Sequence, residues 1–193
     1  FSSLSLKRMK KAFIILFLGT LIAFQACNKD QVISEPTPVD DGVELEIPPH
    51  FPPPFSFDDN PLTISGIELG RRLFYDPRLS ADSTQACANC HLQDFNFSDF
   101  NQFSTGIDGI QGDKNAMAIV NLAWQSTFFW DGRSIALEEQ ALEPIVNPIE
   151  MHDTWENVVK KLKADQMYQE QFTKAFGENS INSDNATKAI SQF

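Results

Sequence analysis

Apolar residues recur at helical spacing from about residue 62 onward. In the clearest stretch, Trp155, Val158, Val159 and Leu162 form one apolar stripe. Capping residues, prolines and glycines around such stretches set the bounds of five predicted helices. They are 65–74 capped by Ser65, 134–142 ending before Pro144, a helix opened by Asp153 and Glu156 at capping-box spacing, 166–176 ending at Gly177, and a last helix capped by Ser183. No stretch alternates with the period of a strand, so the predicted fold class is all-α.

The first 26 residues have the pattern of an export signal. Two lysines precede an uncharged apolar run, residues 12–24, which is too short to cross a bilayer comfortably. Cys27 follows a small residue, as at the cleavage site of bacterial lipoproteins, where the cysteine becomes the lipidated first residue. We predict a lipoprotein signal peptide over 1–26, with 1–8 upstream of the true start, and lipidation of Cys27. The alternative for Cys27 is an ordinary buried or disulfide-bonded cysteine.

Residues 27–61 are rich in proline and in acidic side chains, with PTP at 36–38 and PPHFPPP at 48–54. This composition cannot bury a core and favours an extended, semi-rigid spacer. We predict a linker that lifts a folded domain, residues 62–193, from a membrane. The last residues, AISQF, continue a helical pattern, so we expect the sequence to be a fragment of a longer protein.

Charge narrows the range of partners. The net charge is −11 at pH 7, and removal of residues 1–26, which hold four basic residues and no acidic one, lowers it by four to −15. Such a surface repels nucleic acid and steers a basic partner towards it. A well-solvated, acidic exported protein is the alternative explanation.

The motif CANCH, residues 87–91, concentrates chemistry in a chain with three cysteines and three histidines. C-x-x-C-H is the attachment signature of c-type haem, in which two thiols bond to vinyl groups and the adjacent imidazole binds iron. A zinc site would need a second Cys/His pair, and a thioredoxin-like redox pair would need a βαβ setting. We therefore predict that Cys87 and Cys90 hold haem c and that His91 binds its iron.

The second axial ligand separates an electron carrier from an enzyme. A carrier commonly fills both axial positions with His and Met, whereas an enzyme that cleaves peroxide needs one position open or openable. Between His91 and Trp130 there is no second histidine, and Met117 is the only methionine. Its apolar setting is more typical of a core residue. An open position and ligation by Met117 both remain as interpretations.

Four segments in fixed order carry a family resemblance. They are LGRRLFYDPRLS (69–80), CANCH, FSTGIDGIQGDKNAMAIVNLAW (103–124) and FFWDGRSIALEEQALEPIVNPIEMH (128–152). Residues 62–193 resemble the N-terminal haem domain of the bacterial di-haem cytochrome c peroxidases and their methylamine-utilisation relatives. The resemblance implies a cytochrome c-like domain whose haem reduces hydrogen peroxide to water. A second haem domain, expected beyond Phe193, would take electrons from a small cytochrome c or a copper protein.

The resemblance also implies roles for single residues. Trp130 would lie between the two haems on the electron route, and Asn115 would bind a calcium ion at the domain junction. Glu150 would move a proton between the peroxide oxygens, and Gln140 would orient the peroxide without titrating. Each residue also has an ordinary structural alternative: Trp130 a core residue, Gln140 an exposed helix residue and Glu150 a helix cap.

Many relatives carry a histidine, in the loop that matches residues 95–113, which must leave the iron before peroxide binds. This loop has none here, so we hypothesise a site that is open without reductive activation. The expected function is a lipid-anchored periplasmic peroxidase, compatible with a homodimer, that uses cytochrome electrons. The alternative is a di-haem electron-transfer or substrate-oxidising protein of the methylamine-utilisation type.

Overall fold

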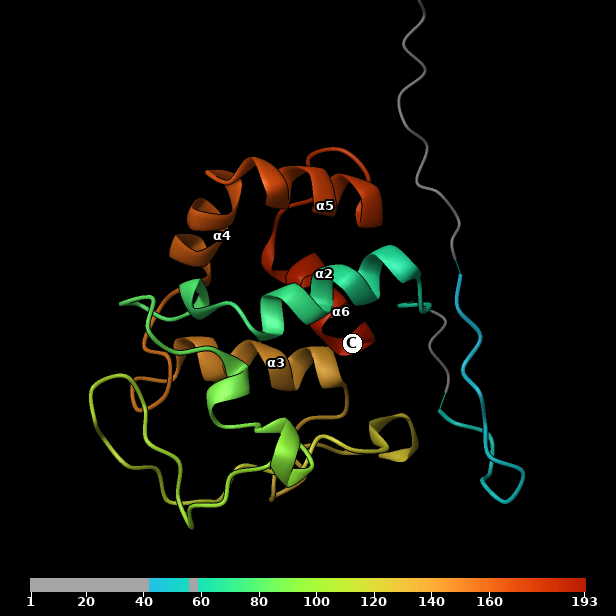
Figure 1. Ribbon diagram of the computed structural model, residues 1–193, viewed down its shortest axis with the longest axis horizontal. Helices are drawn as coiled ribbons and strands as arrows, with labels where there is room; N and C mark the ends of the chain where they lie inside the picture. The colour runs from blue at the N-terminus through green and yellow to red at the C-terminus, as the bar shows by residue number, and fades with distance from the viewer. Residues whose placement is uncertain (1–41, 56–58) are drawn as a thin grey trace, which may run out of the picture. The chain divides into compact units, whose positions relative to one another are not determined.

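The computed structural model describes residues 42–55 and 59–193, and this part of the chain is helical with only isolated β-bridges. The all-α prediction is confirmed there. The predicted signal peptide and Cys27 lie outside the described residues. The α-helices are α2 (Ile64–Phe74), α3 (Leu137–Val146), α4 (Trp155–Lys163), α5 (Gln166–Phe176) and α6 (Ser183–Gln192), and the 3-10 helices are η2 (Pro77–Leu79), η3 (Cys87–Asn89), η4 (Gln93–Phe95) and η5 (Leu122–Trp124) (Figure 1).

Three helices are capped by a different residue from the one that the sequence predicts. Thr63, not Ser65, caps α2, because its Oγ1 accepts a hydrogen bond from the Gly66 amide at 3.0 Å. Thr154 caps α4 and Asn182 caps α6, one residue from the predicted Asp153 and Ser183. Neighbouring hydroxyl, amide and carboxyl side chains are nearly equivalent as caps, and the backbone angles decide which one serves.

The second predicted helix, 134–142, is displaced towards the C-terminus. α3 begins at Leu137 and continues through Pro144 to Val146. Proline removes only its own amide donor, and near the end of a helix this costs one hydrogen bond, so the helix tolerates it. The bounds of α5 are confirmed, and it ends at Gly177, whose φ of 87° lies in the region that glycine favours.

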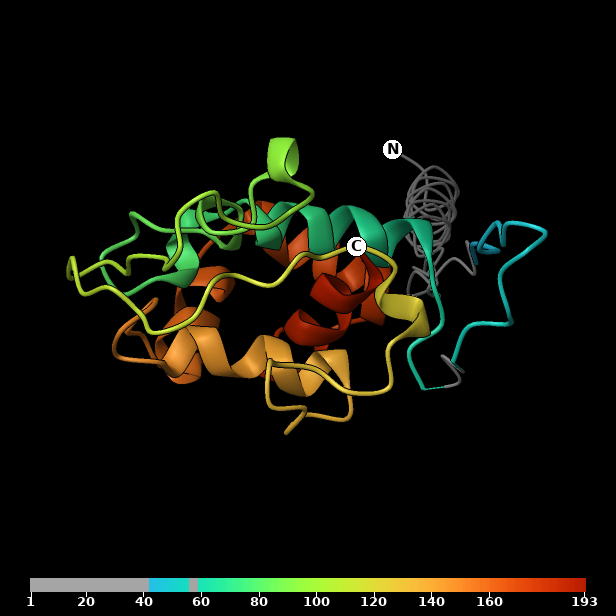
Figure 2. The same cartoon turned by 90° about the horizontal axis from the view of Figure 1, so that it is seen from below.

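The core forms around α2, on which both α5 and α6 pack. α6 lies between α2 and α3, and α5 packs on both α2 and α4 (Figure 2). The fully buried side chains come from each of these helices and from the turns between them. They include Leu69, Leu73, Leu79, Ile145, Val158, Leu162, Tyr168, Phe172, Ala186 and Ala189.

Gly70 allows α2 and α6 to approach each other closely. A Cβ at this position would lie 1.8 Å from the carbonyl oxygen of Ala189 on α6. We expect Gly70→Ala to lower the free energy of unfolding by about 3 kcal/mol, because two helix backbones must separate. Gly112→Ala is the matched control, since its nearest contact would be an ordinary 3.6 Å. Chemical denaturation that gives equal stabilities for the two variants would contradict this packing.

Residues 80–136 contain no α-helix and bury few apolar side chains. Ala86 and Phe128 are the buried apolar residues of this stretch, whereas six large ones are well exposed. These six are Phe95, Phe100, Ile110, Val120, Trp130 and Ile135. The stretch therefore forms a loop-rich, apolar wall that the protein's own core does not cover.

The described part of the proline-rich segment contacts this wall. The indole Nε1 of Trp124 donates a hydrogen bond to the Pro52 carbonyl at 2.7 Å, and the Phe55 amide donates to the Ala123 carbonyl at 2.9 Å. Residues 51–55 are thus attached to the domain and do not act as a free spacer. Within residues 42–55 and 59–193, no helix is long and apolar enough to span a bilayer.

Candidate active site

The CANCH segment folds as a single tight turn. η3 begins at Cys87, whose carbonyl accepts hydrogen bonds from the amides of Cys90 (3.1 Å) and His91 (3.0 Å). The side chain of Asn89 closes the turn by accepting from the Ala86 amide at 2.8 Å. One turn therefore presents both thiols and the imidazole together, as attachment to one porphyrin requires.

Both thiols are free, partly buried and neutral. Burial raises the pKa of Cys87 to about 12 and also raises the pKa of Cys90. A structural zinc site takes four ligands, and no group of three or more candidate ligand side chains (His, Cys, Asp or Glu) occurs among the described residues.

Among the described residues, His91 is held through one ring nitrogen. Its Nδ1 lies 2.9 Å from the Phe97 carbonyl and 3.1 Å from the Met117 carbonyl. Carbonyl oxygens cannot donate, so Nδ1 carries the proton, and burial lowers the pKa of the ring towards its neutral form. Nε2 is left with its lone pair available to a metal, an arrangement typical of metal-binding histidines.

Met117 is poorly placed to be the second axial ligand. Its carbonyl bonds Nδ1, on the side of the imidazole turned away from Nε2. A second axial ligand must approach the iron from the face opposite His91. The backbone of Met117 instead supports the His91 ring from behind, and the open position stays a prediction.

Glu150 lies in the turn that follows α3. Its amide donates to the Asn147 carbonyl at 3.0 Å, its own carbonyl accepts from the Ile107 amide at 3.0 Å, and it caps no helix. Burial raises the pKa of its carboxyl group, and the Glu150 charge in turn helps to raise the pKa of Cys87 and Cys90. The structure thus brings Glu150 within electrostatic reach of both thiols.

Asn147 positions the carboxyl group of Glu150, and sequence reasoning missed it. Its Nδ2 donates to Glu150 Oε1 at 2.9 Å, while its Oδ1 accepts from the Ile149 amide at 3.1 Å. One carboxylate oxygen is therefore fixed, and the other has no hydrogen-bond partner among the described residues. The Asn-Pro dipeptide signalled only a turn, not the direction of the side chain.

Gln140 and Trp130 are less closely connected to Glu150 and the CANCH turn. Gln140 is half-buried on α3, and no hydrogen bond joins it to Glu150 in the described part of the chain. Trp130 is 63% exposed, so it is not a core residue, and its Nε1 donates to the Asn115 carbonyl at 2.9 Å.

Arg133 contacts the Phe129 ring and pairs with Glu143.

The side chain of Asn115 forms hydrogen bonds with three other residues of the protein. Its Nδ2 donates to the carbonyls of Asp99 (3.1 Å) and Asn101 (2.7 Å), and its Oδ1 accepts from Ser98 at 3.2 Å. It organises the loop between the CANCH segment and Trp130. The calcium role stays a prediction.

The site fits a c-type haem. Two neutral thiols and an imidazole with a free Nε2 share one turn. The loop-rich wall of residues 80–136 provides apolar side chains that the protein leaves uncovered. These are the donor set and the apolar contact surface that a covalently bound porphyrin requires.

Comparison with known proteins also supports a c-type haem site. The chain is 37% identical to the methylamine utilization protein MauG of Methylophilus methylotrophus over 146 residues, 76% of this chain and 43% of that protein. It is 40% identical to the cytochrome c551 peroxidase of Nitrosomonas europaea over 126 residues, 65% of this chain and 38% of that protein. The crystal structure of a MauG-like protein associated with microbial copper homeostasis matches with a TM-score of 0.74 and 35% identity, covering 78% of this chain and 45% of that one.

The chain spans less than half the length of each of these relatives. The family model described as di-haem cytochrome c peroxidase matches residues 65–193, which include the CANCH turn and Glu150. The predicted resemblance is confirmed: this chain belongs to the di-haem cytochrome c peroxidase family.

Proposed function

We propose that this chain is the peroxide-reducing haem domain of an exported cytochrome c peroxidase. Membership of the family implies c-type haem, which Cys87, Cys90 and His91 would hold. When bound, haem iron supplies the site and the electrons for splitting the O–O bond of hydrogen peroxide. The observation that carries the proposal is the partly buried Glu150 carboxyl, with its raised pKa, close to the CANCH turn.

Glu150 acts as the proton carrier. It accepts a proton from the inner oxygen of peroxide and returns it to the outer oxygen, which leaves as water. A raised pKa brings the carboxyl group closer to neutrality and so makes both transfers easier. Gln140, from α3, orients the peroxide by hydrogen bonding and does not titrate.

Asn147 sets the pH range of this carrier. Its hydrogen bond stabilises the charged carboxylate and so holds down the pKa of Glu150 against the effect of burial. In Asn147→Asp the donor is lost and a second negative charge faces Glu150, so the pKa rises further. We expect the acidic limb of kcat/KM for peroxide to move upward by about one pH unit. An unchanged limb, measured from pH 4 to 9, would contradict this role.

Electrons enter from a small cytochrome c or a copper protein through a second haem domain. The exposed Trp130 indole, fixed by its hydrogen bond to the Asn115 carbonyl, is our proposed conductor between the domains. We further propose a periplasmic location, with Cys27 as lipid anchor, residues 1–26 as signal peptide and the part of the linker that precedes Phe51 as tether. A calcium ion at Asn115 and a homodimer belong to the same proposal.

A second candidate is oxidation of another substrate, or plain electron transfer. The observation that favours it is the similarity to MauG proteins, together with the lack of a histidine in residues 95–113. The two functions separate in one experiment. The full-length protein, with both haems attached, is mixed with reduced small cytochrome c, and oxidation of the cytochrome is followed with and without hydrogen peroxide. Peroxide-dependent turnover supports the peroxidase, and its absence favours the second candidate.

A further inference from the structure

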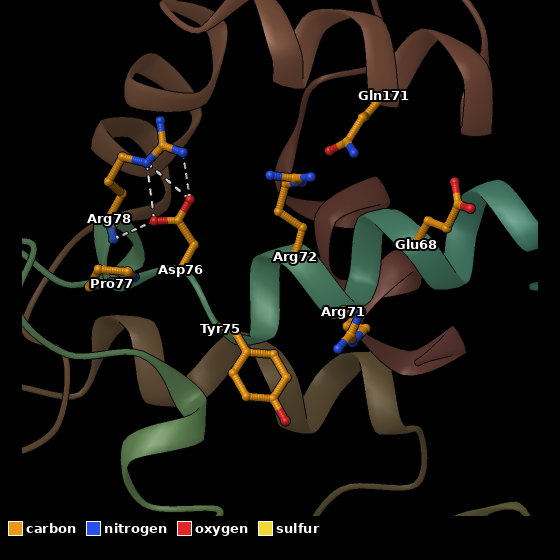
Figure 3. A pocket seen from close by; sticks show the side chains of 8 residues that line it. All are labelled: Glu68, Arg71, Arg72, Tyr75, Asp76, Pro77, Arg78 and Gln171. Carbon is orange, nitrogen blue, oxygen red and sulfur yellow. Dashed lines mark hydrogen bonds and ion pairs between the residues drawn. The ribbon is translucent and has the colours of Figure 1, made fainter.

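An open cavity of about 530 Å³ lies beside the C-terminal half of α2. Its lining comes from α2, from the turn into η2 and from Gln171 on α5 (Figure 3). None of the candidate active-site residues lines it. Its volume lies in the range of small-molecule sites.

Two arginines of this cavity are not neutralised by neighbours. Arg78, which also lines it, is fully engaged, with Asp76 at 2.7 Å and Asp165 at 2.6 Å. Glu68 pairs with Lys174 at 3.3 Å. Arg71 and Arg72 have no ion pair or side-chain hydrogen bond within residues 42–55 and 59–193. Two guanidinium groups without an ion pair among the described residues thus line this cavity, while its two acidic side chains, Glu68 and Asp76, are paired with other residues.

Gln171 adds an unsatisfied acceptor. Its Oε1 is buried and has no hydrogen-bond partner among the described residues. Arg72 from α2 and Gln171 from α5 point towards each other across the cavity (Figure 3). A buried carbonyl oxygen without a donor is unfavourable, so a ligand that brought its own donor would be stabilised here.

We propose that this cavity binds a small protonated oxyanion, of the hydrogenphosphate class. Guanidinium groups match phosphate oxygens in geometry and charge, so Arg72, which points towards Gln171, holds the anion, and Arg71, which points away from Arg72, contributes its positive charge only. The hydroxyl group of the anion donates to Gln171 Oε1. Sulfate has the same shape and charge but no hydroxyl at neutral pH, and a phosphate monoester dianion likewise lacks one. The site should therefore prefer inorganic phosphate to both.

The test is calorimetric titration of the haem-loaded protein with inorganic phosphate, sulfate and methyl phosphate, an ester without a hydroxyl group, at pH 7.5 and constant ionic strength. We expect one phosphate per chain, bound about tenfold more tightly than sulfate or the ester, because only phosphate satisfies the buried acceptor. Arg72→Gln should weaken phosphate at least about tenfold. Lys163→Gln, the same charge change at an exposed position of α4 outside the cavity, should leave it within about twofold.

Gln171→Leu should bring phosphate and sulfate to equal affinity, with thermal unfolding recorded to verify that the variant is folded. The comparison of anions on the unmodified protein does not depend on any variant. The proposal is overturned by a lack of saturable phosphate binding, by equal affinity for phosphate and sulfate in the unmodified protein, or by equal losses in Arg72→Gln and Lys163→Gln.

Discussion

Replacing Cys87 and Cys90 together by alanine is expected to abolish covalent haem attachment. The two thiols share one turn with His91 and are free to form both thioether bonds. Protein denatured and stripped with acidic acetone should lose all haem absorbance in the double variant, whereas the unmodified protein should keep it. His91 remains in the variant, so non-covalent haem can still bind before denaturation.

Gln85→Ala is the matched control for the cysteine variant. Its side chain lies 3.6 Å from the sulfur of Cys90, so it perturbs the same turn without removing a thiol. We expect this variant to keep covalent haem in full. Covalent haem in the double cysteine variant, or zinc in place of haem in the unmodified protein, would show that the CANCH turn has another role.

Glu150→Gln should slow the reaction of the haem-loaded protein with hydrogen peroxide by about 10²- to 10⁴-fold, the usual contribution of a positioned acid–base group. Glutamine keeps the size and polarity of the side chain and removes only its ability to carry the proton. Stopped-flow absorbance measures the second-order rate with peroxide, and the haem content of both proteins is compared first. Glu156→Gln, an exposed acid in the first turn of α4, is the control and should react at the normal rate.

The pH dependence of this rate has a defined sign. The pKa of Glu150 is raised by burial, so the base is protonated at a higher pH than an ordinary glutamate, and activity falls as the pH drops through that raised value. Stability moves in the opposite direction: a raised carboxyl pKa stabilises the fold at pH values below the ordinary glutamate pKa, and this contribution is lost as the pH rises. Glu150→Gln should remove both dependences. An acidic limb that survived in Glu150→Gln would belong to another group.

Local signals in the sequence were sufficient to predict the helices, but not all of the residues at which they begin and end. Gly177 marked the end of α5 because only a residue tolerant of positive φ fits there. Thr63 and Ser65 offer equivalent hydroxyl groups two residues apart, and their roles depend on contacts with distant residues such as Gln192, whose Oε1 lies 3.0 Å from the Thr63 amide. Pro144 was taken as a stop, although a proline in the final turn removes a single bond.

Some residues of the candidate site could be predicted from the sequence, whereas the contacts that position them could not. The C-x-x-C-H spacing identified Cys87, Cys90 and His91, because two attachment cysteines and an iron-binding histidine must reach the same haem. The support of His91 by the Met117 carbonyl joins residues 26 positions apart, and no local pattern signals it. The hydrogen bond from Asn147 to Glu150 depends on how one turn directs a side chain. Such contacts come from the tertiary structure, which periodicity and propensity do not specify.

The most direct test of the proposed peroxidase is the stoichiometry of turnover. The full-length protein, with both haems attached, is given a limiting amount of hydrogen peroxide and an excess of reduced small cytochrome c, and both are followed to completion. Reduction of peroxide to water takes two electrons and two protons, so two cytochromes should be oxidised per peroxide consumed, without release of oxygen. Peroxide loss without cytochrome oxidation, or with release of oxygen, would contradict the assignment.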